Sequence, residues 1–176
     1  MQNDISHKNI TLIGAMGSGK TSVGRRLSCV LGSDFFDTDF EIVTRTGVSI
    51  EHIFDVEGES GFRNRETKIL ADLIKIPNLV IATGGGIVTQ KQNLELLKQT
   101  TVIYLQADIE TLLERCLKSK ARPLINNSTD KKKTITDIVN ARAPLYNNAA
   151  DYIINISGKR LYAIINEIKD LINYVK

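Results

Sequence analysis

The chain has 176 residues, of which 42% are apolar and 24% are charged, the balance of one ordinary globular domain. Its 23 basic and 20 acidic side chains give a formal net charge of +3 without a long basic stretch, which argues against a nucleic-acid partner. No eighteen apolar residues run together and residues 1–8 lack an apolar signal segment, so we expect no membrane span and no export. The two cysteines, Cys29 and Cys116, lack metal-site spacing, and we expect a cytoplasmic protein that acts as a monomer.

Short apolar runs alternate with helical patterns along the chain. The strand candidates are residues 10–13, 35–36, 79–82, 102–105 and 152–156. The helix candidates are residues 23–31, 50–55, 62–74, 94–97, 109–117 and 161–175. This alternation predicts an α/β fold in which helices cover both faces of a largely parallel sheet, with ligands at the carboxyl ends of the strands.

One segment breaks this alternation. Residues 118–133 mix Lys, Asn, Ser and Asp around a single apolar core, Pro123-Leu124-Ile125, which is too polar to pack well. We expect a mobile loop there. No internal repeat and no linker occurs, so residues 1–176 are interpreted as a single domain.

The segment Gly14-Ala15-Met16-Gly17-Ser18-Gly19-Lys20-Thr21 matches the phosphate-binding pattern G-x-x-x-x-G-K-[ST], and it follows a strand and opens a helix. Glycines let successive backbone N–H groups turn toward phosphate, and the helix N-terminus adds its positive dipole end. Lys20 can then reach the β- and γ-phosphates, and the Thr21 hydroxyl can ligate Mg²⁺. The segment predicts a nucleoside triphosphate site.

The loop alone leaves a kinase, a GTPase, an ATPase motor and a regulatory switch open. The chain has no N-K-x-D guanine reader, and the D-x-x-G match at residues 55–58 follows a helical stretch, so a GTPase is disfavoured. No G-x-G-x-x-G occurs, which disfavours dinucleotide and protein-kinase sites. The strand at 79–82 ends in Thr83-Gly84-Gly85-Gly86 and not in the acidic residue usual for a motor.

Carboxylates for such a site come from Asp37-Thr38-Asp39, which follows the strand at 35–36. One carboxylate can face Mg²⁺ while the other orients a substrate hydroxyl and accepts its proton. The alternative is an Asx turn that leads into a helix after Asp39. Three successive glycines, Gly84 to Gly86, indicate either the close approach of a ligand or backbone, or a tight turn.

Arg63, Arg122 and Arg142 each stand in otherwise surface-like surroundings. If they converge on one pocket, they indicate an anionic small substrate, because arginine suits bidentate recognition of carboxylate or phosphate. Taken singly, each is more often a solvated charge or a helix ion pair.

In order and spacing, these residues resemble the shikimate kinase family over nearly the whole chain. The motifs that carry the resemblance are the phosphate loop, Asp37-Thr38-Asp39, Gly47-Val48-Ser49-Ile50 with Ile53-Phe54, Gly61-Phe62-Arg63 with Glu66, Thr83-Gly84-Gly85-Gly86, Arg122-Pro123-Leu124 and Arg142-Ala143-Pro144-Leu145-Tyr146. The resemblance implies a three-layer P-loop fold, similar to nucleoside monophosphate kinases. Its five-stranded parallel sheet lies between helices, with a substrate region at about 37–66 and a mobile lid at about 118–133.

The resemblance also implies a role for each matching residue. It assigns the nucleotide to Gly17, Ser18, Gly19, Lys20, Thr21, Ser22, Arg115 and Arg122. It assigns Mg²⁺ to Thr21 and Asp37, and the acceptor to Asp39, Arg63, Gly84, Gly85, Gly86 and Arg142. Catalysis falls to Lys20, Asp39 and Arg122, with Asp39 as the candidate base.

The function implied by the resemblance is transfer of the γ-phosphate of ATP to the 3-hydroxyl of shikimate. Two other hypotheses remain from the residues. One is a kinase of another polar carboxylated metabolite such as gluconate, and the other is a nucleotide-binding regulatory module that transfers no phosphate.

Overall fold

The structure is a computed structural model that describes residues 8–117 and 130–173. Arg122 and most of the segment expected to form a lid lie outside the described residues. No helix in the two described ranges is both long and apolar enough to cross a lipid bilayer.

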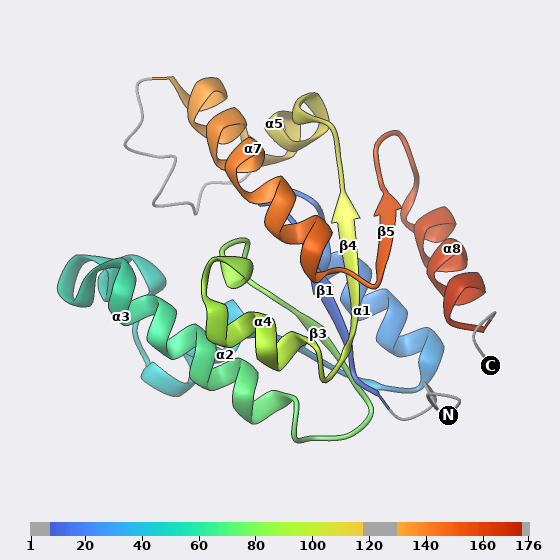
Figure 1. The fold of residues 1–176 in the computed structure, drawn as a ribbon, viewed down its shortest axis with the longest axis horizontal. Helices are drawn as coiled ribbons and strands as arrows, with labels where there is room; N and C mark the ends of the chain where they lie inside the picture. Colours follow the sequence, from blue (N-terminus) through green and yellow to red (C-terminus); the bar gives the residue numbers. More distant parts are fainter. Residues whose placement is uncertain (1–7, 118–129, 174–176) are drawn as a thin grey trace.

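Five parallel strands form one sheet in the order β2-β3-β1-β4-β5 (Figure 1). The strands are β1 (Ile10–Ile13), β2 (Asp34–Asp37), β3 (Leu79–Ala82), β4 (Thr101–Gln106) and β5 (Tyr152–Asn155). β1 and β3 have the bounds that the apolar runs predict, because both are buried along their whole length. The five predicted strands are thus confirmed, and the sheet is entirely parallel.

Helices connect successive strands and cover both faces of the sheet. They are α1 (Lys20–Leu31), α2 (Thr38–Thr46), α3 (Ile50–Leu73), α4 (Lys91–Leu97), α5 (Ile109–Leu117), α7 (Lys131–Ala149) and α8 (Leu161–Asn173), with a 3₁₀ turn at Ile87–Thr89. The side chains of β4 alternate between the two faces. Val102 and Tyr104 pack toward α5 and α7, while Ile103 and Leu105 pack toward α1 and α8. The expected three-layer architecture is confirmed.

α7 corrects the expected extent of the lid, which was placed at residues 118–133. Lys131 to Lys133 belong to the first turn of α7, because the Asp130 side chain caps the helix by accepting a hydrogen bond of 3.0 Å from the Lys133 backbone. The helix continues to Ala149 in spite of Pro144 within it. This helix was absent from the sequence prediction, and it carries Arg142.

α3 is broken by Gly58, which adopts φ 69° and ψ −176° inside it. The break explains why the sequence pattern predicts two shorter helices, 50–55 and 62–74, in place of one. The N-terminal part of α3 and the neighbouring α2 pack around Ile42, Ile53 and Phe62 against β3. This small core holds the expected substrate region beside the sheet edge formed by β2 (Figure 1).

Candidate functional site

The phosphate loop turns between β1 and α1, at the carboxyl end of the central strand. Gly17 and Gly19 adopt φ 82° and 83°, conformations that a side chain would strain. α1 begins after Gly19, none of the described side chains caps it, and its first turn contains no acidic residue. Its first N–H groups and its positive dipole end therefore suit an anion, as expected from the sequence.

Lys20 lies within the loop that it is expected to serve. Its ammonium donates hydrogen bonds to the carbonyl oxygens of Gly14 and Ala15 at 2.8 and 3.0 Å, and it lies 3.4 Å from the Ser18 hydroxyl. Arg115 of α5 reaches the same loop from the other side, with its Nη1 3.4 Å from the Gly17 carbonyl oxygen. Two cations thus border the place where a phosphate chain would lie.

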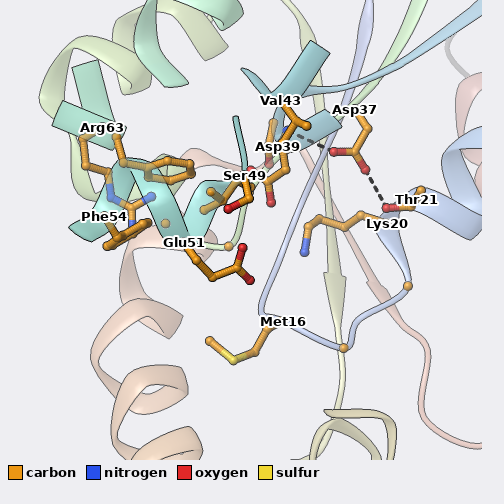
Figure 2. Close-up of a pocket in the computed structure, with 18 of the residues that line it drawn as sticks. Met16, Lys20, Thr21, Asp37, Asp39, Val43, Ser49, Glu51, Phe54 and Arg63 are labelled. Carbon is orange, nitrogen blue, oxygen red and sulfur yellow. Dashed lines mark hydrogen bonds between the residues drawn. The ribbon is translucent and has the colours of Figure 1, made fainter. Parts of the chain in front are cut away.

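Asp37 joins the end of β2 to the phosphate loop. Its Oδ2 accepts a hydrogen bond of 2.6 Å from the Thr21 hydroxyl (Figure 2). Its Oδ1 accepts from the backbone N–H groups of Asp39 and Phe40. Asp37 is therefore the N-cap of α2, and the helix begins two residues earlier than in the sequence alternative, which placed it after Asp39. The capping role is thus found at Asp37 in place of Asp39, and the same carboxylate contacts Thr21.

Thr21 and Asp37 together present a hydroxyl oxygen and a carboxylate, which are the oxygen donors that Mg²⁺ prefers. No cluster of three His, Cys, Asp or Glu side chains suited to a metal occurs within residues 8–117 and 130–173. A magnesium site of this kind needs none, since phosphates and water complete it. The pair therefore fits the expected metal position.

The glycine run after β3 makes room for charged side chains. A Cβ on Gly86 would lie 2.2 Å from Nη2 of Arg63, and a Cβ on Gly84 would lie 2.4 Å from Oε1 of Glu66 and 2.8 Å from Oδ1 of Asp39. The Gly84 N–H donates to the buried Thr38 hydroxyl at 3.0 Å, which ties the run to α2. Charged side chains therefore leave no room for a Cβ at Gly84 and Gly86, a cause that neither sequence alternative named.

Arg63 is buried on α3 and paired with two glutamates. Its Nη1 donates to Glu66 at 2.8 Å, and its Nε and Nη2 donate to Glu59 at 3.2 and 3.0 Å. Glu66 is fully buried, and its Oε1 has no hydrogen-bond partner among the described residues. Glu66 stands in a motif of the family, and its spacing of three from Arg63 on a helix was a usable signal for the pair.

Arg142 and Tyr146 lie one turn apart on α7, and both donate to the Gly85 carbonyl oxygen, Arg142 at 3.1 Å. Burial raises the pKa of Tyr146 to about 12, so its hydroxyl stays a donor at neutral pH. The Tyr146 ring stacks on Tyr104 of β4 at 5.0 Å between centroids. The sheet thereby fixes the end of α7 that carries Arg142 against the glycine run.

The acidity of Asp39 is strongly perturbed by its surroundings. Burial, together with the nearby charges of Glu66 and Asp37, raises the pKa of Asp39 from its ordinary 3.8 to about 7, while Lys20 and Arg63 oppose the rise. Its Oδ1 is buried without a hydrogen-bond partner among the described residues. A carboxylate with a pKa near neutrality is matched to proton transfer at physiological pH.

One cavity of about 670 Å³ joins these groups. Most of the residues expected from the sequence line it: Gly17, Gly19, Lys20, Thr21, Ser22, Asp37, Asp39, Arg63, Gly84, Gly85, Gly86, Arg115 and Arg142. Ser18 is buried behind the loop, and Arg122 lies outside the described residues. The sequence patterns assigned no role to several residues that line the cavity from α2, α3 and the N-cap of α3, namely Val43, Ser49, Ile50, Glu51, Phe54 and Phe62.

The parallel sheet, the phosphate loop at its central strand and the adjoining cavity with its charged side chains define a P-loop kinase of small molecules. Deoxyadenosine kinase from M. mycoides shares this fold, with a TM-score of 0.60 at 13% identity over 94% of this chain and 99% of that chain. At this low sequence identity, the structural similarity supports the fold alone.

The sequence model of the shikimate kinase family matches residues 16–173. Shikimate kinase of Histophilus somni is 42% identical over 170 residues, which cover 96% of this chain and 97% of the relative. The solved shikimate kinase from Acinetobacter baumannii, in complex with shikimate, is 42% identical and superposes with a TM-score of 0.92 over 96% of this chain and 94% of that chain. This chain belongs to the shikimate kinase family, and it is an ATP-dependent kinase.

Proposed function

We propose that this chain transfers the γ-phosphate of ATP to the 3-hydroxyl of shikimate and releases 3-phosphoshikimate and ADP. The observation that carries the proposal is one cavity that joins the phosphate loop to arginine, glycine and carboxylate groups suited to a hydroxylated acid. The membership of the chain in the shikimate kinase family supports the same acceptor. The two cysteines, which have no pairing or metal-site spacing, support a cytoplasmic location, and we further propose that the enzyme acts as a monomer.

The nucleotide occupies the phosphate-loop end of the cavity. The backbone of Gly17 to Ser22 and the N-terminus of α1 bind the phosphate chain, and Lys20 exchanges its contacts with loop carbonyl oxygens for the β- and γ-phosphates. We assign Arg115, whose Nη1 lies 3.4 Å from the Gly17 carbonyl oxygen, to the adenine side of the nucleotide on the family resemblance. We assign Arg122 to the transferring phosphate on the family resemblance alone.

Thr21 and Asp37 hold Mg²⁺ in this proposal, and the ion, when bound, offsets negative charge on the phosphates of ATP. Their role rests on the contact between the hydroxyl and the carboxylate, which sets two oxygen donors beside the phosphate loop. Asp37 also caps α2, so one side chain fixes both the metal position and the start of the helix that carries Asp39.

The acceptor lies at the opposite end of the cavity. Arg63 and Arg142 bind its carboxylate, and the small glycines Gly84 to Gly86 let its ring approach the backbone. The 3-hydroxyl then faces Asp39, whose carboxylate orients it and accepts its proton as the phosphoryl group is transferred. Positioning and charge stabilisation account for most of the rate, because the transition state of phosphoryl transfer is loose.

A coupled assay of ADP release tests the function. We expect ADP formation that depends on shikimate and is far weaker with gluconate. Gluconate is an open chain and lacks the ring that, in this proposal, holds the hydroxyl and the carboxylate of shikimate in fixed positions. A matched sample without acceptor measures wasteful ATP hydrolysis. If a folded sample turns over ATP equally fast with and without shikimate, the proposal is wrong.

A further inference from the structure

The beginning of α3 forms a wall of the cavity that is apolar apart from one charge. Val43 of α2 and Ile50 and Phe54 of α3 line this wall. Ser49 lines it too, but its hydroxyl caps α3 by accepting a backbone hydrogen bond of 3.2 Å. Glu51 is thus the charged group of the wall.

The Glu51 side chain extends from α3 toward the part of the cavity that Met16 and Lys20 border (Figure 2). It is exposed to the cavity and forms no hydrogen bond or ion pair with any other residue in the described ranges. An acidic residue in the first turn of a helix also has a purely structural use, since it complements the helix dipole. That use does not require the side chain to line a cavity.

The acceptor has more hydroxyl groups than the proposed function uses. Its carboxylate is assigned to Arg63 and Arg142 and its 3-hydroxyl to Asp39, which leaves the hydroxyls on C4 and C5 of shikimate. A few placed polar groups on an otherwise apolar wall orient a ligand, and a carboxylate is a strong acceptor for a hydroxyl donor.

We propose that Glu51 determines acceptor specificity by accepting a hydrogen bond from one of these two unreactive hydroxyls. This inference rests on the proposed function and deepens it. An acceptor that lacks the hydroxyl would leave the carboxylate without this hydrogen bond, and enzymes discriminate between substrates through polar groups left unpaired. Glu51 is then a substrate-binding residue distinct from Asp39, which faces the reacting hydroxyl.

The test compares wild type and Glu51→Ala with three acceptors: shikimate, 4-deoxyshikimate and 5-deoxyshikimate. For each protein, kcat/KM on a deoxy analogue is divided by kcat/KM on shikimate. For one of the two analogues, we expect this ratio to be at least about tenfold lower in wild type than in Glu51→Ala. With shikimate itself, the variant should lose about tenfold, mainly in KM for shikimate, with KM for ATP unchanged. Glu51→Gln should recover part of the discrimination, because an amide oxygen still accepts a hydrogen bond.

Glu110→Ala is the matched control, since Glu110 is a first-turn acid of α5 that does not line the cavity. Both alanine variants should lower Tm slightly through the helix dipole, but only the change at Glu51 should alter the ratio between acceptors. Equal ratios in wild type and Glu51→Ala for both analogues would overturn the inference while the proposed function stands. A folded wild type without activity on shikimate would overturn both.

Discussion

Replacing Gly86 with alanine tests whether the acceptor end of the cavity depends on Arg63. Gly86 has φ −100°, so its backbone accommodates alanine without strain. The new Cβ, however, would lie 2.2 Å from Nη2 and 2.3 Å from Cζ of Arg63. Non-bonded contacts to carbon need about 3.5 Å, so the guanidinium has to move by more than about 1 Å.

The surroundings of Arg63 leave little room for that movement. The Arg63 side chain is 6% exposed, and the side chain of its partner Glu66 is 0% exposed. If the ion pair survives, overpacking should cost about 1–3 kcal/mol of unfolding free energy. If Glu66 loses its partner, the cost should approach about 3–5 kcal/mol, because a buried carboxylate would remain unpaired.

In Gly86→Ala, the KM for only one of the two substrates should change. A displaced guanidinium loses a charge-assisted contact to the acceptor, so KM for shikimate should rise at least about tenfold while KM for ATP stays nearly constant. Steady-state kinetics and urea unfolding measure both effects. Gly85→Ala is the control for stability, since its nearest new neighbour is the Met16 nitrogen at 3.4 Å. A Gly86→Ala protein with wild-type stability and wild-type KM for shikimate would refute this reasoning.

Four further predictions concern the same cavity. Below pH 7, kcat/KM for shikimate should fall about tenfold per pH unit, because the pKa of Asp39 is about 7 and the base must be ionised; a flat profile would exclude Asp39 as the base. Asp39→Asn should abolish turnover but stabilise the ligand-free protein at pH 8 by at most about 4 kcal/mol. Because the pKa of Asp39 is raised from 3.8 to about 7, stability falls as the pH rises between these values and the full cost remains above pH 7, so thermal melts should show a smaller gain at pH 5; equal gains would contradict it. Arg142→Ala should raise KM for shikimate about 10–100-fold, and an unchanged KM would refute its role. Thr21→Val should raise the Mg²⁺ concentration needed for half-maximal activity several-fold, and chelation should stop turnover; activity that persists in chelator would contradict the metal assignment.

Local patterns in the sequence were sufficient for the sheet and for the phosphate loop. β1, β3 and β4 are buried on both faces, so each reads as a continuous apolar run. The loop carries its own signature, since the backbone conformations at Gly17 and Gly19 require glycine. For these elements, the residues that determine the structure are adjacent in the chain.

α7 escaped prediction for a physical reason. The helix begins with three lysines and contains Pro144, features that argue against a helix when the sequence is read locally. Tertiary contacts stabilise it, because Ile135 and Tyr146 pack into the core beneath it. Its N-terminal boundary depends on a single cap, Asp130.

Only the family resemblance could predict that residues far apart in the sequence meet in one cavity. Arg63 and Gly86 are far apart in sequence, and nothing local indicates that one makes space for the other. The raised pKa of Asp39 likewise depends on burial and on the charge of Glu66, both of which arise from folding. The pairing of Arg63 with Glu59 and Glu66 was the part of the site most open to prediction, because those residues share a helical face.

The central claim is that this cavity directs phosphate to one hydroxyl of shikimate, and the product tests it most directly. Wild-type protein incubated with ATP, Mg²⁺ and shikimate should yield one phosphate monoester for each ADP, located on C3 by ³¹P and proton NMR. Asp39→Asn should yield neither product under the same conditions. ADP accompanied by inorganic phosphate, or a phosphate on C4 or C5, would contradict the account.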